Sequence, residues 1–331
     1  MEKAVPAIGL SRGMRLRRFY SVYSKTIVPF LIAVMLIVGG EIVSPGFAGS
    51  NHILQLIKTA SFLGVLALAQ SIVILAGGEG IDLSVGAIAT IGAVMAAVIL
   101  NGQDSRLFMT VPLVLAAGFL LGMVNGIGIA IFIVPPLIMT LGMASVINGL
   151  VIIYSQGFIF KGSASELLMA IGGGQSIPGF PNMIIVWGVM ILISLFVLSR
   201  TKSGITLYGV GANEITAELS GIRAMRVRAL AYGISGVISA LAGMFLLGYI
   251  GLPYIDIGSD YVLPSVAAAV IGGISLAGGS GSYLGVVGGS VLLTTLTALL
   301  VTLRMGEGGK QVVFGLVLII LLALYGRRSR D

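Results

Sequence analysis

Residues 59–77 read TASFLGVLALAQSIVILAG, an apolar run that contains no charged side chain. A helix needs about 20 mostly apolar residues to cross the hydrocarbon core of a bilayer, and this run has about that length. The rest of the chain has the same character, because 57% of its 331 residues are hydrophobic and only 9% are charged. Soluble domains carry about 25% charged residues. The composition therefore predicts an all-α, polytopic membrane protein.

About ten such runs follow one another along the chain. They cover approximately residues 26–44, 59–77, 84–101, 111–133, 136–155, 182–199, 229–251, 261–278, 283–303 and 311–326. The runs at 84–101 and 261–278 are short and lie next to glycine clusters. We therefore expect one transmembrane helical bundle over residues 26–326. A basic segment, 1–25, precedes it, and a short tail, 327–331, follows it.

Lysine and arginine are distributed unevenly between the segments that connect these runs. Six precede the first run, five lie between the sixth and the seventh, and three follow the tenth. With ten spans, these 14 of the 19 basic residues share one side, which the positive-inside bias identifies as cytoplasmic. Both termini and the segment 200–228 are therefore expected in the cytoplasm. The net charge of +7 is then expected to attract anionic membrane lipid, and it does not indicate binding of nucleic acid.

The segment 200–228 contains the sequence GANEITAELSGI at residues 211–222. Asn213 is a favoured helix N-cap, and Glu214 stands in the first turn, where the helix dipole favours an anion. Gly221 suits the end of a helix. The pattern predicts a helix of about two turns outside the membrane. Because a helix this short is marginal in water, it needs a surface on which to pack.

Three segments resemble the ribose-type ABC permeases, a large family of bacterial monosaccharide importers. Residues 211–222 are similar to the family pattern G-x-N-x-x-x-A-x-x-S-G-I, with Thr216 where many members have alanine. Residues 80–86 read GIDLSVG, which is similar to the family's GGIDLSVG, although Glu79 interrupts the glycines. Residues 270–279 read VIGGISLAGG and resemble the family's VxGGxSLxGG. The three segments stand in the family's order.

The resemblance implies a permease subunit that moves a pentose, a hexose or a similar small polar solute by alternating access. It implies three protein partners: a cytoplasmic ABC ATPase, a second permease chain, and a solute-binding protein outside the membrane. It also implies the bacterial inner membrane as the location. The residues that it implies in ATPase coupling are Gly211, Asn213, Glu214, Ala217, Glu218, Ser220, Gly221 and Ile222.

Nucleotide chemistry is not expected in this chain. It has no G-x-x-x-x-G-K-[ST] loop, the motif whose backbone amides and lysine hold nucleotide phosphates. ATP and magnesium are therefore expected on the partner ATPase, and we expect this chain to be no enzyme and to bind no cofactor or metal.

Several polar residues lie in or beside the apolar runs. In hydrocarbon each must find a hydrogen-bonding partner, so helix capping and bonds between helices are one interpretation. The other is that they line the solute path, since polar groups at membrane depth are candidates for function. The candidates for the path are Gln70, Asp82, Ser84, Asn125 and Asn148.

Glycines recur at intervals of four at 118, 122 and 126, and again at 281, 285 and 289. Small residues at this spacing favour close packing of membrane helices. The packing could lie within one chain or form a seam between two chains.

Other functions are less well supported by the residues. A proton-coupled secondary transporter usually needs acidic or histidine side chains in the bundle, and the predicted spans hold almost none; sodium coupling remains an alternative. An intramembrane serine protease would need a base beside Ser280, and the single histidine, His52, is expected at the opposite membrane face. A channel is the remaining alternative.

Overall fold

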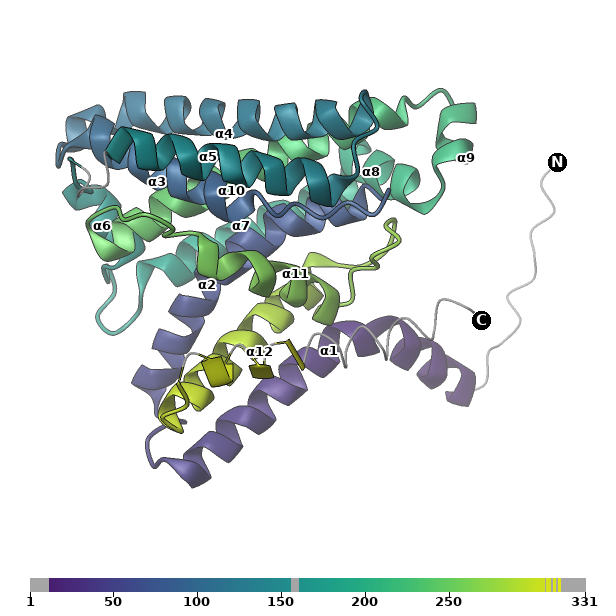
Figure 1. Cartoon of the computed structure of the whole chain (residues 1–331). Helices are drawn as coiled ribbons and strands as arrows, with labels where there is room; N and C mark the ends of the chain where they lie inside the picture. Colours follow the sequence, from purple (N-terminus) through teal and green to yellow (C-terminus); the bar gives the residue numbers. More distant parts are fainter. Residues whose placement is uncertain (1–11, 156–160, 307, 311, 314, 317–331) are drawn as a thin grey trace.

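The computed structural model describes residues 12–155, 161–306, 308–310, 312–313 and 315–316, which form a bundle of α-helices (Figure 1). The order is α1 (Arg12–Val43), α2 (Ser50–Leu75), α3 (Val85–Leu100), η1 (Asp104–Arg106), α4 (Leu107–Ala130), α5 (Pro136–Ser155), α6 (Glu166–Gly172), α7 (Asn182–Arg200), α8 (Lys202–Ala212), α9 (Glu214–Leu219), α10 (Ala224–Ile250), η2 (Ser259–Tyr261), α11 (Val262–Ile271) and α12 (Tyr283–Thr302).

Helices α2 and α10 form the centre of the bundle. The most apolar window of α2 is 89% buried and that of α10 is 72% buried, whereas those of α1, α4, α5 and α7 are only 17–22% buried. The outer helices expose large apolar side chains such as Phe108, Leu192 and Phe196. Exposure of this extent is what a lipid-facing surface requires.

The glycines of α4 allow its backbone to approach that of α10. A Cβ on Gly118 would overlap the carbonyl oxygen of Gly236, and one on Gly122 would overlap that of Tyr232. One on Gly126 would lie 2.6 Å from the Ala229 Cα. The predicted small-residue packing is thus confirmed, and for α4 it lies within the chain.

Seven helices within the described residues are long and apolar enough to cross a membrane. Two of the ten predicted runs form shorter helices, α3 with 16 residues and α11 with 10. The prediction of a helix through residue 278 was wrong, because α11 ends at Ile271 and Gly273 then takes φ +88°, outside the helical region. The run 311–326 lies largely outside the described residues, as do 1–11 and 327–331. The count of ten remains a prediction.

Two short helices were not predicted. The chain between α5 and α7 contains α6, whose first turn receives a cap from Asp104: Leu167 N donates to its Oδ1 at 2.9 Å. The segment 200–228 contains α8 as well as the predicted short helix, and Thr201 caps α8 by accepting from Gly204 N at 3.2 Å. Figure 1 shows α6 and α9 at opposite ends of the bundle.

Candidate functional site

The helix predicted between residues 213 and 222 exists as α9, Glu214–Leu219. Asn213 is its N-cap, as predicted: its Oδ1 accepts from Thr216 N at 2.9 Å. This bond satisfies one of the amide groups that the first turn of a helix leaves without a partner. The local sequence therefore determines where α9 begins.

The end of α9 is a Schellman motif. Gly221 N donates to Glu218 O at 2.9 Å, and Ile222 N donates to Ala217 O at 3.0 Å. Gly221 takes φ +82°, the left-handed conformation that glycine adopts without strain. Ile222 also packs against the apolar cluster that contains Ala217, as is common in this motif. The predicted role of Gly221 in ending the helix is confirmed.

One side of α9 packs on the protein and the other is free. Ala217 is buried against Val210 and Ala224, whereas Ile215 is 73% exposed and Leu219 is 86% exposed. Beside them lies a hollow of about 490 Å³, lined by Glu218, Gly221, Ile222, Arg223, Met225 and Arg226. The end of the bundle that carries α9 thus presents apolar and charged groups together, as a surface for another protein does.

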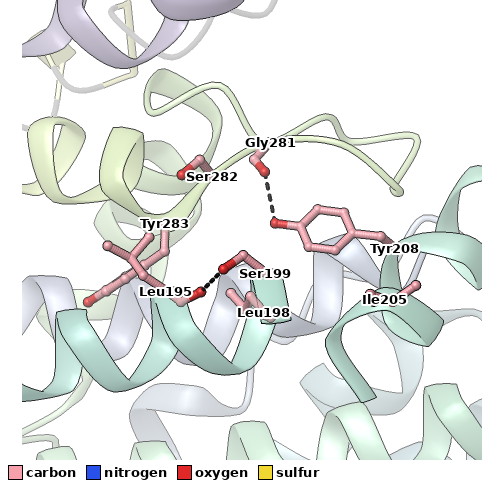
Figure 2. A pocket seen from close by; sticks show the side chains of 8 residues that line it. All are labelled: Leu195, Leu198, Ser199, Ile205, Tyr208, Gly281, Ser282 and Tyr283. Carbon is pink, nitrogen blue, oxygen red and sulfur yellow. Dashed lines mark hydrogen bonds between the residues drawn. The ribbon is translucent and has the colours of Figure 1, made fainter. Parts of the chain in front are cut away.

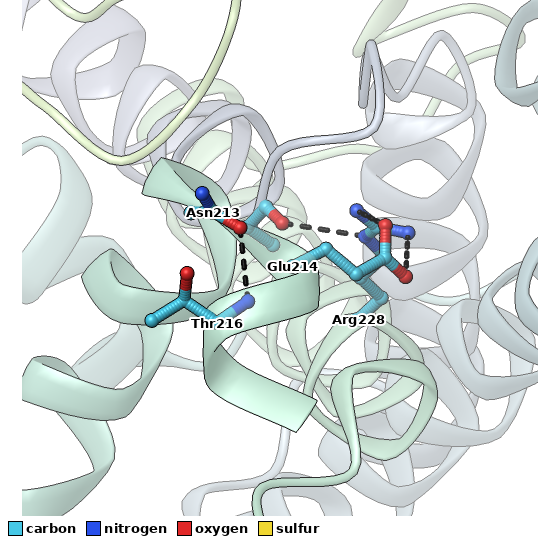
Figure 3. A network of polar contacts seen from close by, with 5 residues as sticks. Asn213, Glu214, Thr216 and Arg228 are labelled. Atoms are coloured by element: carbon cyan, nitrogen blue, oxygen red, sulfur yellow. Dashed lines mark hydrogen bonds and ion pairs between the residues drawn. The ribbon is translucent and has the colours of Figure 1, made fainter. Parts of the chain in front are cut away.

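A forked ion pair fixes the first turn of α9 to α10. Arg228 Nη1 donates to Glu214 Oε1 at 2.9 Å, and Nη2 donates to Oε2 at 2.7 Å. Arg228 Nε donates at 3.4 Å to Ala76 O, at the end of α2. Figure 3 shows the guanidinium of Arg228 facing the carboxylate of Glu214. One side chain therefore joins α9, α10 and α2.

Glycines from two of the resembling segments, together with Gly77 just before the third, meet beside this ion pair. A Cβ on Gly77 would lie 2.9 Å from the Gly211 Cα, and one on Gly278 would lie 2.5 Å from the Gly77 Cα. A Cβ on Gly279 would overlap the backbone of Ala212, and Gly279 N donates to Leu75 O at 3.1 Å. We call Gly77, Gly211, Gly278 and Gly279 the glycine junction.

Tyr208 provides a second contact between α8 and the connection before α12. Its hydroxyl donates to Gly281 O at 2.8 Å, and burial raises the pKa of the phenol, which keeps it a neutral donor. Figure 2 shows this bond at the side of a pocket of about 440 Å³ between α7, α8 and the start of α12. The lining is mainly apolar, so the pocket offers few groups to recognise a polar solute.

Four of the five candidates for the solute path gather around Asp82. Asp82 Oδ1 accepts from Ser84 N at 2.9 Å and from Ser84 Oγ at 2.6 Å, and Oδ2 accepts from Ser235 Oγ at 3.1 Å. Asn125 Nδ2 donates to Ser84 Oγ at 2.8 Å. With its amide oriented to satisfy both partners, Gln70 donates to Asp82 O and accepts from Asp82 N, each at 3.1 Å.

These residues have no exposed surface, so in this conformation they hold helices together. Helix capping, one interpretation of these residues, is not made by the side chain of Ser84, which is the N-cap residue of α3; Asp82 instead accepts the amide of Ser84 itself. Asn148 lies apart, about 12 Å along α5 from Thr140, whose hydroxyl is 3.5 Å from Ile81 O. A role of these five residues in the path remains a prediction.

Sequence reasoning missed Arg228, which contributed only to the charge count, and Ser235. It also treated the glycines at 77, 211 and 278 as separate local features. The resemblance was the available signal, because Gly211, Gly278 and Gly279 belong to matched segments and Gly77 lies three residues before another one. Nothing in their spacing along the chain indicates that they are neighbours in space.

Comparison with known proteins gives a consistent result. Residues 52–322 match the family described as "Branched-chain amino acid transport system / permease component". The chain is 33% identical to the ribose import permease protein RbsC of Bacillus subtilis, over 91% of this chain and 92% of that protein. It is 29% identical to RbsC of Haemophilus influenzae, over 88% and 90%. It is 32% identical to the autoinducer 2 import system permease protein LsrC of Escherichia coli O9:H4, over 90% and 86%. No solved structure shows significant similarity to the chain.

Proposed function

The chain belongs to the family of permease components of branched-chain amino acid transport systems, and from that premise we propose that it is the membrane subunit of an ABC importer for a sugar or a similar small polar solute. The relatives named above are import permeases for ribose and autoinducer 2. They indicate the class of solute more directly than the family description, which names branched-chain amino acids. A pentose, a hexose or a related small polyol is the proposed cargo.

The observation that carries the proposal is α9. It is a capped helix at one end of an apolar bundle, packed on one side and exposed on the other. Such a helix offers a partner a defined shape without further ordering, and this reduces the entropy lost on binding. We infer that a cytoplasmic ABC ATPase docks on it. The docking and coupling residues are Gly211, Asn213, Glu214, Ala217, Glu218, Ser220, Gly221 and Ile222.

Docking of the ATPase on α9 assigns a role to each subunit of the importer. The ATPase holds ATP and magnesium, and this chain contributes no catalytic residue or cofactor site. A second permease chain, identical or different, completes the path. A solute-binding protein approaches the opposite end, where α6 lies (Figure 1). In this arrangement both termini are cytoplasmic, and the membrane is the bacterial inner membrane.

The other candidate functions have less support. His52 lies in the first turn of α2, and Gly279 contacts Leu75 at the last residue of that helix. Ser280 is therefore separated from His52 by nearly the length of α2, about 35 Å, which excludes a protease pair. Among the described residues, Asp82 is the one buried carboxylate, and hydrogen bonds occupy both of its oxygens, so a proton-coupled transporter is not favoured.

Reconstitution tests the proposal. The chain would be placed in proteoliposomes with a candidate ABC ATPase and a candidate solute-binding protein from the same organism, and uptake of labelled ribose and other small sugars would be measured. We expect uptake that requires internal ATP and the external binding protein. Uptake driven by a proton or sodium gradient without ATP would refute the importer assignment. The Leu219→Asp variant, altered on the exposed side of α9, should insert normally and fail to retain the ATPase on purification.

A further inference from the structure

We propose that Arg228 is a positioning residue that makes α9 and the connection between α2 and α3 move as one body. The inference deepens the proposed function and rests on it, because it concerns how a displacement of α9 by an ATPase would reach the bundle. The three donor nitrogens of Arg228 bind acceptors on two different elements outside its own helix, the carboxylate of Glu214 on α9 and the carbonyl of Ala76 after α2.

The geometry of the contact is specific to arginine. A guanidinium is a rigid planar fork, so two of its nitrogens can face a carboxylate while the third faces another acceptor. A lysine ammonium is a compact charge and cannot span the same two partners with fixed angles. Glu214 is 43% exposed, so we assign the pair a role in position and not a large contribution to stability.

The guanidinium also lies against the turn that follows α2. A Cβ on Gly78 would lie 3.0 Å from the Arg228 Cζ, so a larger residue there would push the side chain away. Gly78 takes φ +66°, which glycine adopts readily. Arg228 can therefore keep this position only if residue 78 has no side chain.

From this turn the chain leads directly into the buried polar cluster. Asp82 is six residues beyond Ala76, and its side chain is bonded to Ser84 and to Ser235 on α10. Ser84 is bonded in turn to Asn125 on α4. A shift of α9 that Arg228 carries to Ala76 would thus act on the start of α3 and on α4. Without Arg228, α9 would keep its apolar packing on Val210 and Ala224. The close approach of Gly211 on α8 to Gly77 would be the remaining link to the turn after α2, with no polar side-chain contact among the described residues to hold α9 itself in place.

A measurement within the chain tests this link independently of transport. The protein has no cysteine, so spin labels at Leu219→Cys on α9 and Glu79→Cys in the connection between α2 and α3 would be unique. Both positions are exposed. In detergent or nanodiscs we expect a narrow distance distribution that becomes clearly broader in the Arg228→Met and Glu214→Gln variants. Lys202→Met is the matched control, since Lys202 is an exposed cation on the neighbouring α8.

Transport provides the second measurement, as the ratio of solute imported to ATP hydrolysed in the reconstituted complex. We expect Arg228→Met to retain the ATPase and its hydrolysis but to lower this ratio by about fivefold or more, the size of a typical coupling between sites. The ratio for Arg228→Lys should lie between those of Arg228→Met and the unaltered chain. The ratio for Lys202→Met should equal that of the unaltered chain. A purely structural role would lower both activities together and leave the ratio unchanged.

The outcomes separate the two proposals. An unchanged distance distribution in Arg228→Met and Glu214→Gln would overturn the positioning role, even if uptake falls. A broader distribution in a chain that shows no ATP-dependent uptake would support the mechanical link and refute the importer function. If Arg228→Met fails to fold, as judged by size-exclusion chromatography, Arg228→Lys and Glu214→Gln decide the question, because both keep most of the local packing.

Discussion

Asn125 donates a hydrogen bond to the hydroxyl of Ser84 at 2.8 Å, although 41 positions separate the two residues in sequence. The Ser84 hydroxyl in turn donates a hydrogen bond to Asp82 Oδ1 at 2.6 Å, so an amide on α4 indirectly supports a carboxylate before α3. Hydrogen bonds among its members lower the cost of burying this polar cluster inside an apolar bundle. Loss of its central member should therefore affect more than one helix.

Replacing Asp82 should test that cluster. In Asp82→Ala the Ser84 amide, the Ser84 hydroxyl and the Ser235 hydroxyl lose their acceptor, and each buried unsatisfied group costs about 1–3 kcal/mol. We expect a free energy of unfolding lower by about 3 kcal/mol or more in total. Asp82→Asn keeps one acceptor oxygen and should lose less. Thermal unfolding in detergent would measure both variants.

Glu79→Gln is the control for this series, because Glu79 is an exposed acidic residue in the same connection. It should unfold at the temperature of the unaltered protein. Equal stability of Asp82→Ala and the unaltered protein would show that the hydrogen bonds around Asp82 do not hold α3, α4 and α10 together.

The glycine junction should be intolerant of a single methyl group. A Cβ on Gly211 would overlap Leu75 O and would lie 2.6 Å from Gly279 N, and both obstacles are backbone atoms that cannot rotate away. We expect Gly211→Ala to separate α8 from the end of α2, to lower the thermal unfolding temperature, and to abolish uptake.

Gly209→Ala is a matched control on the same helix. Nothing lies within 4 Å of a Cβ at Gly209, and alanine in an exposed helix interior is favoured over glycine by about 1 kcal/mol. This variant should be as stable as the unaltered chain or slightly more so, with normal uptake. Similar behaviour of the two alanine variants would contradict close packing at the junction.

The difference between α9 and the junction shows what the sequence can predict. The start and the end of α9 depend on contacts within ten residues, Asn213 to Thr216 and Ile222 to Ala217, so their signals are local and were identified. The junction depends on backbones that approach from distant parts of the chain. A glycine at 77 or 278 has the same sequence signature whether it ends a helix or meets another backbone, so pattern alone could not distinguish these cases.

The membrane spans also show that a sequence pattern predicts local structure but not contacts between distant segments. Apolar runs predicted the long helices well, because hydropathy and length are properties of the run itself. They overestimated α11, whose apolar sequence continues past Ile271 while the backbone turns at Gly272 and Gly273. A Cβ on Gly272 would overlap the α12 backbone at Val286, so these glycines serve a tertiary contact that hydropathy does not detect.

The end of α9 should depend on the backbone conformation of Gly221 and not on its size. Nothing lies within 4 Å of a Cβ there, but φ is +82°. Asparagine tolerates this conformation, whereas a β-branched residue is strained in it by about 1–2 kcal/mol or more. We expect Gly221→Asn to retain the ATPase on purification and Gly221→Val to lose most of it. Equal retention by both variants would mean that the Schellman turn is not needed for docking.

The orientation of the bundle can be tested with single cysteines, since the chain has none of its own. Glu166 on α6 and Thr216 on α9 are exposed at opposite ends of the bundle (Figure 1). If α9 is cytoplasmic, Glu166→Cys should react with an impermeant thiol reagent in spheroplasts, and Thr216→Cys should react only after the membrane is permeabilised. Ser165→Cys is the matched control for access, because Ser165 has no exposed surface and should stay unlabelled in both conditions. Labelling of Thr216→Cys in intact spheroplasts, with protection of Glu166→Cys, would reverse the proposed topology and place the docking surface on the wrong side for an ATPase.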